Sequence, residues 1–175
     1  MTRTIQACAS FLLLAAPLHW AIAGTGSAVG GDPAYEYCLK KGGTDLTFLD
    51  GKRNEEGFCQ FSDGGLIDDW TLYKMAPIHE KDRENHTRAV IAFLAAPSRD
   101  DASPPADTAQ KNCESLGGSV SPWRMKYRPD VTYFSCDFPD KSSIEEWTLY
   151  YGSKRNDGDA PHFSVMGKII RALAQ

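Results

Sequence analysis

The chain contains two copies of one pattern of cysteine, glycine and tryptophan, and this internal repeat limits the folds that it can adopt. Residues 34–43, AYEYCLKKGG, align with residues 109–118, AQKNCESLGG. A second cysteine then opens CQFSD in the first copy and CDFPD in the second, and IDDWTLYK and IEEWTLYY follow at the same distance. Because the spacing returns, we predict two units built on one plan.

The repeat divides the chain into segments. Residues 32–96 are the first predicted unit and residues 107–175 the second. Between them, residues 97–106 read PSRDDASPPA, which has the proline, serine and charge content of an exposed linker. Residues 24–31 are expected to form a flexible N-terminus.

The first 23 residues predict a secretory signal peptide. They carry Arg3, an apolar run from Phe11 to Ala16, and the small-x-small end Ala21-Ile22-Ala23. No other segment approaches the roughly 20 apolar residues of a membrane span, so membrane insertion is not expected. We therefore expect a periplasmic or secreted protein.

Charge and cysteine usage agree with export. Loss of Arg3 with the signal peptide changes the net charge from −4 to −5, which disfavours nucleic acid as a partner. Four cysteines remain once Cys8 is removed. An even number of cysteines in an oxidising compartment favours disulfides over free thiols.

Each copy predicts the same α+β unit. Asp32 can cap a first helix, Pro33 can occupy its first turn, and Gly42-Gly43 can end it. The alternation in residues 44–61 predicts a β-hairpin, and a longer hairpin follows in the second copy, with Pro122 and Pro129 at a strand edge or in the turn. Apolar residues at helical spacing predict a last helix in each unit, over residues 89–96 and 163–173.

The secondary structure of the tryptophan motif, IDDWTLYK in the first copy and IEEWTLYY in the second, is ambiguous from sequence alone. Ser142 and Ser143, three residues before Glu145 and Glu146, offer a capping box for a short helix. The run Trp-Thr-Leu-Tyr has strand propensity instead. We favour the helix, which makes each unit a helix, a β-hairpin, a short helix or strand, and a C-terminal helix.

The cysteine positions predict one disulfide within each unit. Cys38 falls on the first helix and Cys59 on the second hairpin strand, so a bond between them joins helix to sheet. Closing a loop of about 20 residues stabilises a small domain by on the order of 3 kcal/mol. The equivalent bond is Cys113 to Cys136. A four-thiolate zinc site is the alternative, but no CxxC pair exists, so no metal and no cofactor is expected.

These residues resemble a family. In order, each copy has a helix cysteine, Gly-Gly, a hairpin with a second cysteine, Phe-x-Asp, and an acidic pair before tryptophan. This arrangement resembles a small bacterial envelope domain of unknown function that is often labelled a haemolysin. The resemblance covers residues 32–74 and 107–151. Many members carry further cysteines around the acidic pair, where this chain has Ile67 and Ile144. The family has no accepted catalytic residue, so the resemblance implies none here.

The acidic pairs invite a catalytic interpretation, as the two carboxylates of a glycosidase. Adjacent residues point in different directions, however, while that chemistry needs opposed carboxylates about 5 to 10 Å apart. Acids in a first helical turn complement the helix dipole, and we expect the tryptophans to be core anchors. The predicted structural motif comprises Gly42, Gly43, Asp68, Asp69, Trp70, Gly117, Gly118, Glu145, Glu146 and Trp147.

No catalytic residue is predicted. The histidines of the expected mature chain, His79, His86 and His162, lie outside the repeated core and form no HExxH motif. No serine or cysteine nucleophile stands in a recognisable elbow.

The candidate binding residues lie where the copies differ. Trp123, Arg124, Tyr127 and Arg128 belong to the longer hairpin of the second copy, and tryptophan, tyrosine and arginine are enriched in interface hot spots. The alternative is that Trp123 covers the seam between the units.

Three functions follow as hypotheses. The first is a non-catalytic exported module that binds a protein in the bacterial envelope, as an inhibitor of an envelope enzyme or an immunity protein against a toxin. The second is a cell-wall hydrolase with a dispersed active site. The third is a membrane-active, haemolysin-like factor, which would need the apolar side of residues 163–173 to be available.

Overall fold

The computed structural model describes residues 31–79, 88–97, 99, 103–153 and 163–175. The predicted signal peptide, residues 24–30 of the predicted flexible N-terminus, His86 and His162 lie outside these residues. The described residues of the predicted linker belong to no helix or strand.

Each repeat contains a helix, three strands and two further helices in the same order. The first repeat consists of α1 (Pro33–Lys40), β1 (Thr44–Leu49), β2 (Glu55–Gln60), β3 (Leu66–Asp68), α2 (Asp69–Lys74) and α3 (Arg88–Ala95). The second consists of α4 (Thr108–Ser115), β4 (Ser119–Met125), β5 (Arg128–Asp137), β6 (Ser143–Glu145), α5 (Glu146–Tyr151) and α6 (Ser164–Leu173). The α+β repeat is confirmed, with one short strand more per copy than the sequence suggested.

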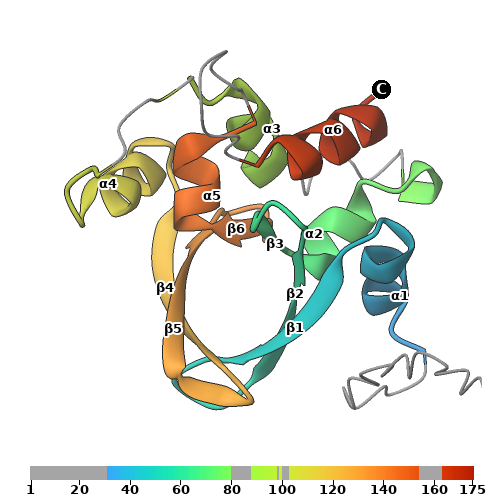
Figure 1. Cartoon of the computed structure of the whole chain (residues 1–175), viewed down its shortest axis with the longest axis horizontal. Helices are drawn as coiled ribbons and strands as arrows, with labels where there is room; N and C mark the ends of the chain where they lie inside the picture. Colours follow the sequence, from blue (N-terminus) through green and yellow to red (C-terminus); the bar gives the residue numbers. More distant parts are fainter. Residues whose placement is uncertain (1–30, 80–87, 98, 100–102, 154–162) are drawn as a thin grey trace, which may run out of the picture. The chain divides into compact units, whose positions relative to one another are not determined.

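Six strands close into one barrel in the order β1-β2-β3-β6-β5-β4, which Figure 1 shows as a ring. Ile67 pairs with Ile144 at the β3–β6 seam, and Leu49 pairs with Arg124 at the β1–β4 seam. Both pairs join equivalent positions of the two repeats, so an approximate two-fold axis passes through both seams. Residues from Gly31 to Gln175 are therefore one compact unit, to whose barrel each repeat contributes half.

The alternation of side chains along each strand separates two cores. Phe48, Phe58 and Leu66 point into the barrel and pack against one another. Cys59 and Ile67, their neighbours in β2 and β3, point outward into a larger core between the sheet and the helices. Function can therefore be sought on the outer surface or inside the barrel.

Both predicted disulfides are present. Cys38–Cys59 joins α1 to β2, and Cys113–Cys136 joins α4 to β5, each with its Cα atoms 5.6 Å apart. All four cysteines are fully buried in the outer core. Each disulfide thus attaches the first helix of a repeat to its own half of the barrel.

The two glycines of each Gly-Gly pair have different roles. Gly42 and Gly117 follow the helix ends with φ of 82° and 81°, a conformation that side chains disfavour. Gly43 and Gly118 lie against the disulfides, where a Cβ atom would overlap both sulfur atoms. The first glycine ends the helix, and the second leaves space for the disulfide.

The last helix of each repeat is capped by the other repeat. Asp63 accepts hydrogen bonds from the backbone N–H groups of Val165 and Met166 at the start of α6 (2.6 and 3.0 Å). Asp140, the equivalent of Asp63, accepts one from the N–H of Arg88 at the start of α3 (2.8 Å). A carboxylate satisfies N–H groups that have no partner within the helix. These exchanged caps tie the repeats together outside the barrel.

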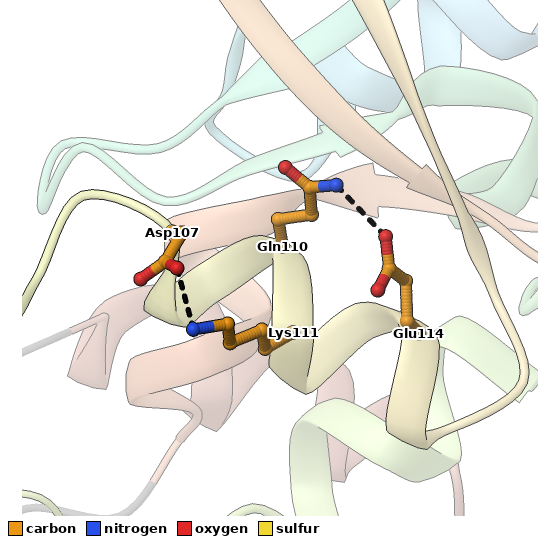
Figure 2. A network of polar contacts seen from close by, with 4 residues as sticks. All are labelled: Asp107, Gln110, Lys111 and Glu114. Carbon is orange, nitrogen blue, oxygen red and sulfur yellow. Dashed lines mark hydrogen bonds and ion pairs between the residues drawn. The ribbon is translucent and has the colours of Figure 1, made fainter.

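Helices α1 and α4 are equivalent but begin differently. Asp32 caps α1 through its side chain, as predicted. Asp107 has the same position in α4, but its carboxylate pairs with Lys111 (2.5 Å). Figure 2 shows this pair beside the bond from Gln110 to Glu114 (2.8 Å). Such exposed i,i+4 pairs contribute little to stability, so they describe a solvated helix face rather than a site.

Two local predictions need correction, and the tryptophan motif, which the sequence left open between helix and strand, contains both a strand and a helix. The IDDWTLYK segment is a strand as far as Asp68 and a helix from Asp69, because the Asp68 carboxylate caps the new helix. Ser143 lies in β6 and does not cap α5, whose cap is Glu145. Trp70 is not a core anchor, since its side chain is 40% exposed while α2 buries Asp69, Thr71 and Leu72 instead.

Candidate functional site

The tryptophan motif joins the two repeats. Thr71 Oγ1 accepts a hydrogen bond from a backbone N–H of β6 (2.9 Å), and Thr148 Oγ1 accepts one from a backbone N–H of β3 (3.1 Å). Ile67 and Ile144 pair between these bonds. We call Ile67, Thr71, Ile144 and Thr148 the clasp. Its pairing explains why the two copies of the motif are so similar.

The first acid of each motif caps the helix that follows. Asp68 accepts a hydrogen bond from the N–H of Thr71 (2.6 Å), and Glu145 accepts one from the N–H of Thr148 (2.7 Å). Both carboxyl groups are buried on the barrel side of their strands. Both the shorter Asp side chain and the longer Glu side chain can accept this hydrogen bond, so the Asp-to-Glu difference between the copies is tolerated.

The second acid of each motif lies on the opposite side. Asp69 covers Gly57 on the outer face of β2, where its carboxyl group lies beside that of Asp45. Burial, followed by the nearby carboxylates, raises the pKa of Asp69 to about 8. Burial and its acidic neighbour raise the pKa of Glu146 to about 7. Adjacent acids thus face different surroundings and do not oppose each other across a substrate.

A chain of hydrogen bonds runs inside the barrel from β4 to β6. Trp123 Nε1 donates to Ser135 Oγ (2.8 Å), and Ser135 Oγ donates to Asp137 Oδ1 (2.7 Å). Ser143 Oγ donates to the same carboxylate oxygen (2.6 Å). All four side chains belong to the second repeat, and their bonds fix the orientation of the Trp123 ring.

A cavity of about 200 Å³ lies beside this network, and we call it the barrel cavity. Its walls include the rings of Phe58 and Trp123, which meet edge to face with centroids 5.8 Å apart. The carboxyl groups of Glu56, Asp68 and Asp137 form another part of the wall. The loop residues Lys141 and Ser142 and the first residue of β6, Ser143, complete its lining, and Lys141 is exposed to solvent.

Asp68 is the least satisfied group in this wall. Its side chain is 3% exposed, and among the described residues no N–H or hydroxyl donates to Oδ1. Burial chiefly raises the pKa of Asp68 to about 7, and Glu56 beside it adds to the shift. Burial raises the pKa of Glu56 as well, and this carboxyl group lies beside that of Asp68. The pair can therefore share a proton or accept an external positive charge.

The predicted binding residues fall into two groups. Trp123 lies in the barrel, where its ring contacts Phe58 of the first repeat, as expected if it covers the seam. Arg124, Tyr127 and Arg128 are exposed on the β4–β5 hairpin, with Tyr127 61% exposed. The four residues thus do not form one surface.

Sequence reasoning missed Glu56 and Asp137 as wall residues. The alternation of Tyr133, Ser135 and Asp137 along β5 shows that they share a face. Which face becomes the interior depends on how the barrel closes, and that is set by pairing between the repeats.

The turns of the two long hairpins form a second candidate surface. We call residues 50–55 and 124–130 the hairpin end; the β1–β4 seam brings the two segments together. A groove of about 440 Å³ lies here, and its lining includes Pro122, Met125, Arg53 and Arg124. The charged residues of the hairpin end are Lys52, Arg53, Arg124, Lys126 and Arg128 against Asp50, Glu55 and Asp130, a net charge of +2.

Other chemistries find little support in the described part of the chain. Among the residues that the structure describes, no group of three His, Cys, Asp or Glu side chains is placed to hold a metal ion. His79 packs its ring against Tyr73, with centroids 4.6 Å apart. No described helix is long and apolar enough to cross a bilayer. The apolar side of α6, including Met166, Ile170 and Leu173, is buried in the outer core.

The fold and the clasp define a class of protein, a disulfide-linked barrel assembled from two tandem copies of one small domain. The chain belongs to the family described as Domain of unknown function (DUF333), whose model matches residues 31–76 and 106–153. The matched ranges contain both disulfides and the clasp and leave out α3 and α6. No curated protein and no solved structure matches the chain significantly. The disulfides indicate an oxidising, extracytoplasmic environment.

Proposed function

We propose that this protein is an exported, non-catalytic module whose hairpin end binds an acidic loop of a partner protein in the bacterial envelope. The observation that carries the proposal is a basic, exposed end on an acidic chain. The hairpin end has a net charge of +2, whereas the whole chain has a net charge of −4. Tyr127 is 61% exposed there between Lys126 and Arg128, and tyrosine and arginine dominate the energetics of many interfaces.

The hairpin end is held in one shape before a partner arrives. Asp50 accepts two backbone N–H bonds within its own turn (2.7 and 2.8 Å). An ion pair between Lys126 and Glu55 (2.6 Å) joins the two turns. A preorganised surface loses little conformational entropy on binding. The groove between Arg53 and Arg124 then offers an acidic loop two guanidinium groups.

The proposed setting is the periplasm or the exterior, reached after removal of residues 1–23 as a signal peptide. Two buried disulfides support this setting, because disulfides form mainly in oxidising compartments. A rigid module that binds a loop can block the enzyme that carries it. We therefore propose an inhibitor or immunity role against an envelope enzyme or toxin.

The test begins with the exported, disulfide-bonded protein as bait in a periplasmic extract, followed by calorimetry with the purified partner. The double variant Tyr127→Ala, Arg128→Glu should weaken binding at least about tenfold without lowering the melting temperature. Binding of the unaltered protein should also weaken as salt is added, because the contact is electrostatic.

The matched control is Lys111→Glu, a charge reversal on the solvated face of α4, outside the hairpin end. It changes the net charge as Arg128→Glu does but should leave the affinity unchanged. If both charge reversals weaken binding equally, or if no protein is retained with a saturable affinity, the hairpin end is not the binding surface.

A further inference from the structure

The barrel cavity is a second site, separate from the hairpin end, and it carries an inference beyond protein binding. We propose that this cavity binds a small aliphatic ammonium ion, with Asp68 as its principal acceptor and the rings of Phe58 and Trp123 as its walls. Three features support the proposal: an acceptor without a donor, a surplus of acids, and aromatic side chains around a small space.

The first feature is Asp68. Oδ2 accepts the N–H of Thr71, so half of the carboxyl group has a structural role. Oδ1 is buried in the cavity wall, and among the described residues no N–H or hydroxyl donates to it. A buried acceptor without a donor destabilises the folded protein, and a ligand that brings an N–H removes this penalty. The cavity therefore lacks a hydrogen-bond donor, which an ammonium group would supply.

The second feature is the sign of the charge. Three carboxyl groups, those of Glu56, Asp68 and Asp137, line the cavity together with one amine, that of Lys141. Asp137 is already satisfied by the hydroxyls of Ser135 and Ser143. Glu56 and Asp68 remain as a pair of neighbouring carboxyl groups. An anionic ligand would meet this acidic pair unfavourably, whereas a cation would let both carboxyl groups ionise.

The third feature decides between an organic cation and a metal ion. No described group of three acids, histidines or cysteines is placed to hold a metal, as noted above. Phe58 and Trp123 instead provide aromatic surface, which attracts ammonium groups through the ring quadrupole. The volume of about 200 Å³ is below the roughly 300–1,000 Å³ of sites for larger ligands, so the ligand should be small.

Nuclear magnetic resonance of the exported, disulfide-bonded protein tests the proposal, because Trp123 reports from within the site. The probe is 1-butylammonium chloride, added at constant ionic strength, and the signal is the indole Nε1–H of Trp123. We expect a saturable shift of this signal, while the indole signals of Trp70 and Trp147 stay in place. The neutral probe 1-butanol has nearly the same shape and should bind at least about tenfold more weakly.

Neighbouring acids provide the matched variants. Asp68→Asn keeps an acceptor for the N–H of Thr71 and should weaken 1-butylammonium binding about tenfold, whereas Asp69→Asn, on the outer face, should leave it unchanged. Glu56→Gln, which caps no helix, serves if Asp68→Asn fails to fold. The proposal is overturned if 1-butanol binds as tightly as the ammonium ion, if the Asn variants at positions 68 and 69 behave alike, or if no saturable shift is found at millimolar concentrations.

Discussion

Phe58 and Leu66 of the first repeat fill the barrel with apolar side chains, whereas Ser135 and Ser143 occupy the equivalent inward positions of the second repeat. The first half of the barrel therefore supplies most of the inner core, and the second half supplies the polar network. The barrel cavity lies where these two halves meet. Divergence after duplication has given one closed interior two chemically different sides.

The clasp shows the opposite behaviour. Thr71 and Thr148 make the same kind of bond to the other repeat, and Ile67 pairs with its own equivalent. Ile67 and Ile144 meet where the repeats join, so a change at either position alters the packing of both repeats. Agreement between the repeats marks assembly at this seam, whereas Leu49 and Arg124, which pair at the other seam, differ.

The largest expected effect comes from removing a disulfide from one repeat. Cys38→Ala with Cys59→Ala, and Cys113→Ala with Cys136→Ala, should each lower the free energy of unfolding by about 3 kcal/mol. The bonds span 21 and 23 residues, so loop closure predicts nearly equal losses. Denaturant unfolding of the two double variants measures both values.

The shape of the transition is the more informative result. If the barrel is one cooperative structure, either double variant should still unfold in a single transition. Two separate transitions, with only one displaced, would show that the repeats unfold independently and that the seams contribute little.

The repeat pattern was sufficient to predict the disulfides, the hairpins and the first helices, because each depends on contacts within one copy. The last helices were predicted from their apolar spacing, although each is capped by the other repeat. The repeat pattern was insufficient for β3 and β6, which are three residues long and are defined by pairing with β2 and β5 and, at Ile67 and Ile144, with each other. The barrel cavity was hidden because it forms only when the barrel closes. The inward orientation of Glu56 and Asp68 follows from closure of the barrel, which involves both repeats.

The clasp gives the second prediction. Thr148→Val should lower the free energy of unfolding by about 2 kcal/mol and Thr71→Val by about 1 kcal/mol. The order follows from the structure, because the N–H of Leu66 that Thr148 Oγ1 accepts is buried, whereas the N–H that Thr71 Oγ1 accepts is only partly buried. Urea unfolding gives the values, provided that the denaturant slope is unchanged.

A matched control for the clasp is Thr132→Val on the exposed face of β5, which should change stability by less than about 0.5 kcal/mol. Equal effects at positions 71 and 148 would show that burial of the accepted N–H does not matter. If the effects at positions 71 and 148 are no larger than that of the control, the clasp does not contribute to the stability of the fold.

The outer acids give the smallest effect, and it depends on pH. Asp69 and Glu146 have pKa values of about 8 and 7 in the folded protein, above the values of an unfolded chain. The folded state then binds more protons than the unfolded state, so stability should fall as pH rises from about 4 to about 8. Asp69→Asn should remove part of this slope, raising the melting temperature by roughly 5 °C at pH 8 and hardly at all near pH 4.

Glu146→Gln completes the comparison between the repeats. Asp69 faces Asp45 and Asp32 as well as Asp68, whereas the pKa of Glu146 is raised by burial and by Glu145 alone. The glutamine variant should therefore raise the melting temperature at pH 8 by less than the asparagine variant does. Melting curves of both variants between pH 4 and pH 8 measure the difference. A larger gain at position 146, or a stability that rises with pH in the unaltered protein and in both variants, would contradict the assignment of buried, protonated acids to the outer face.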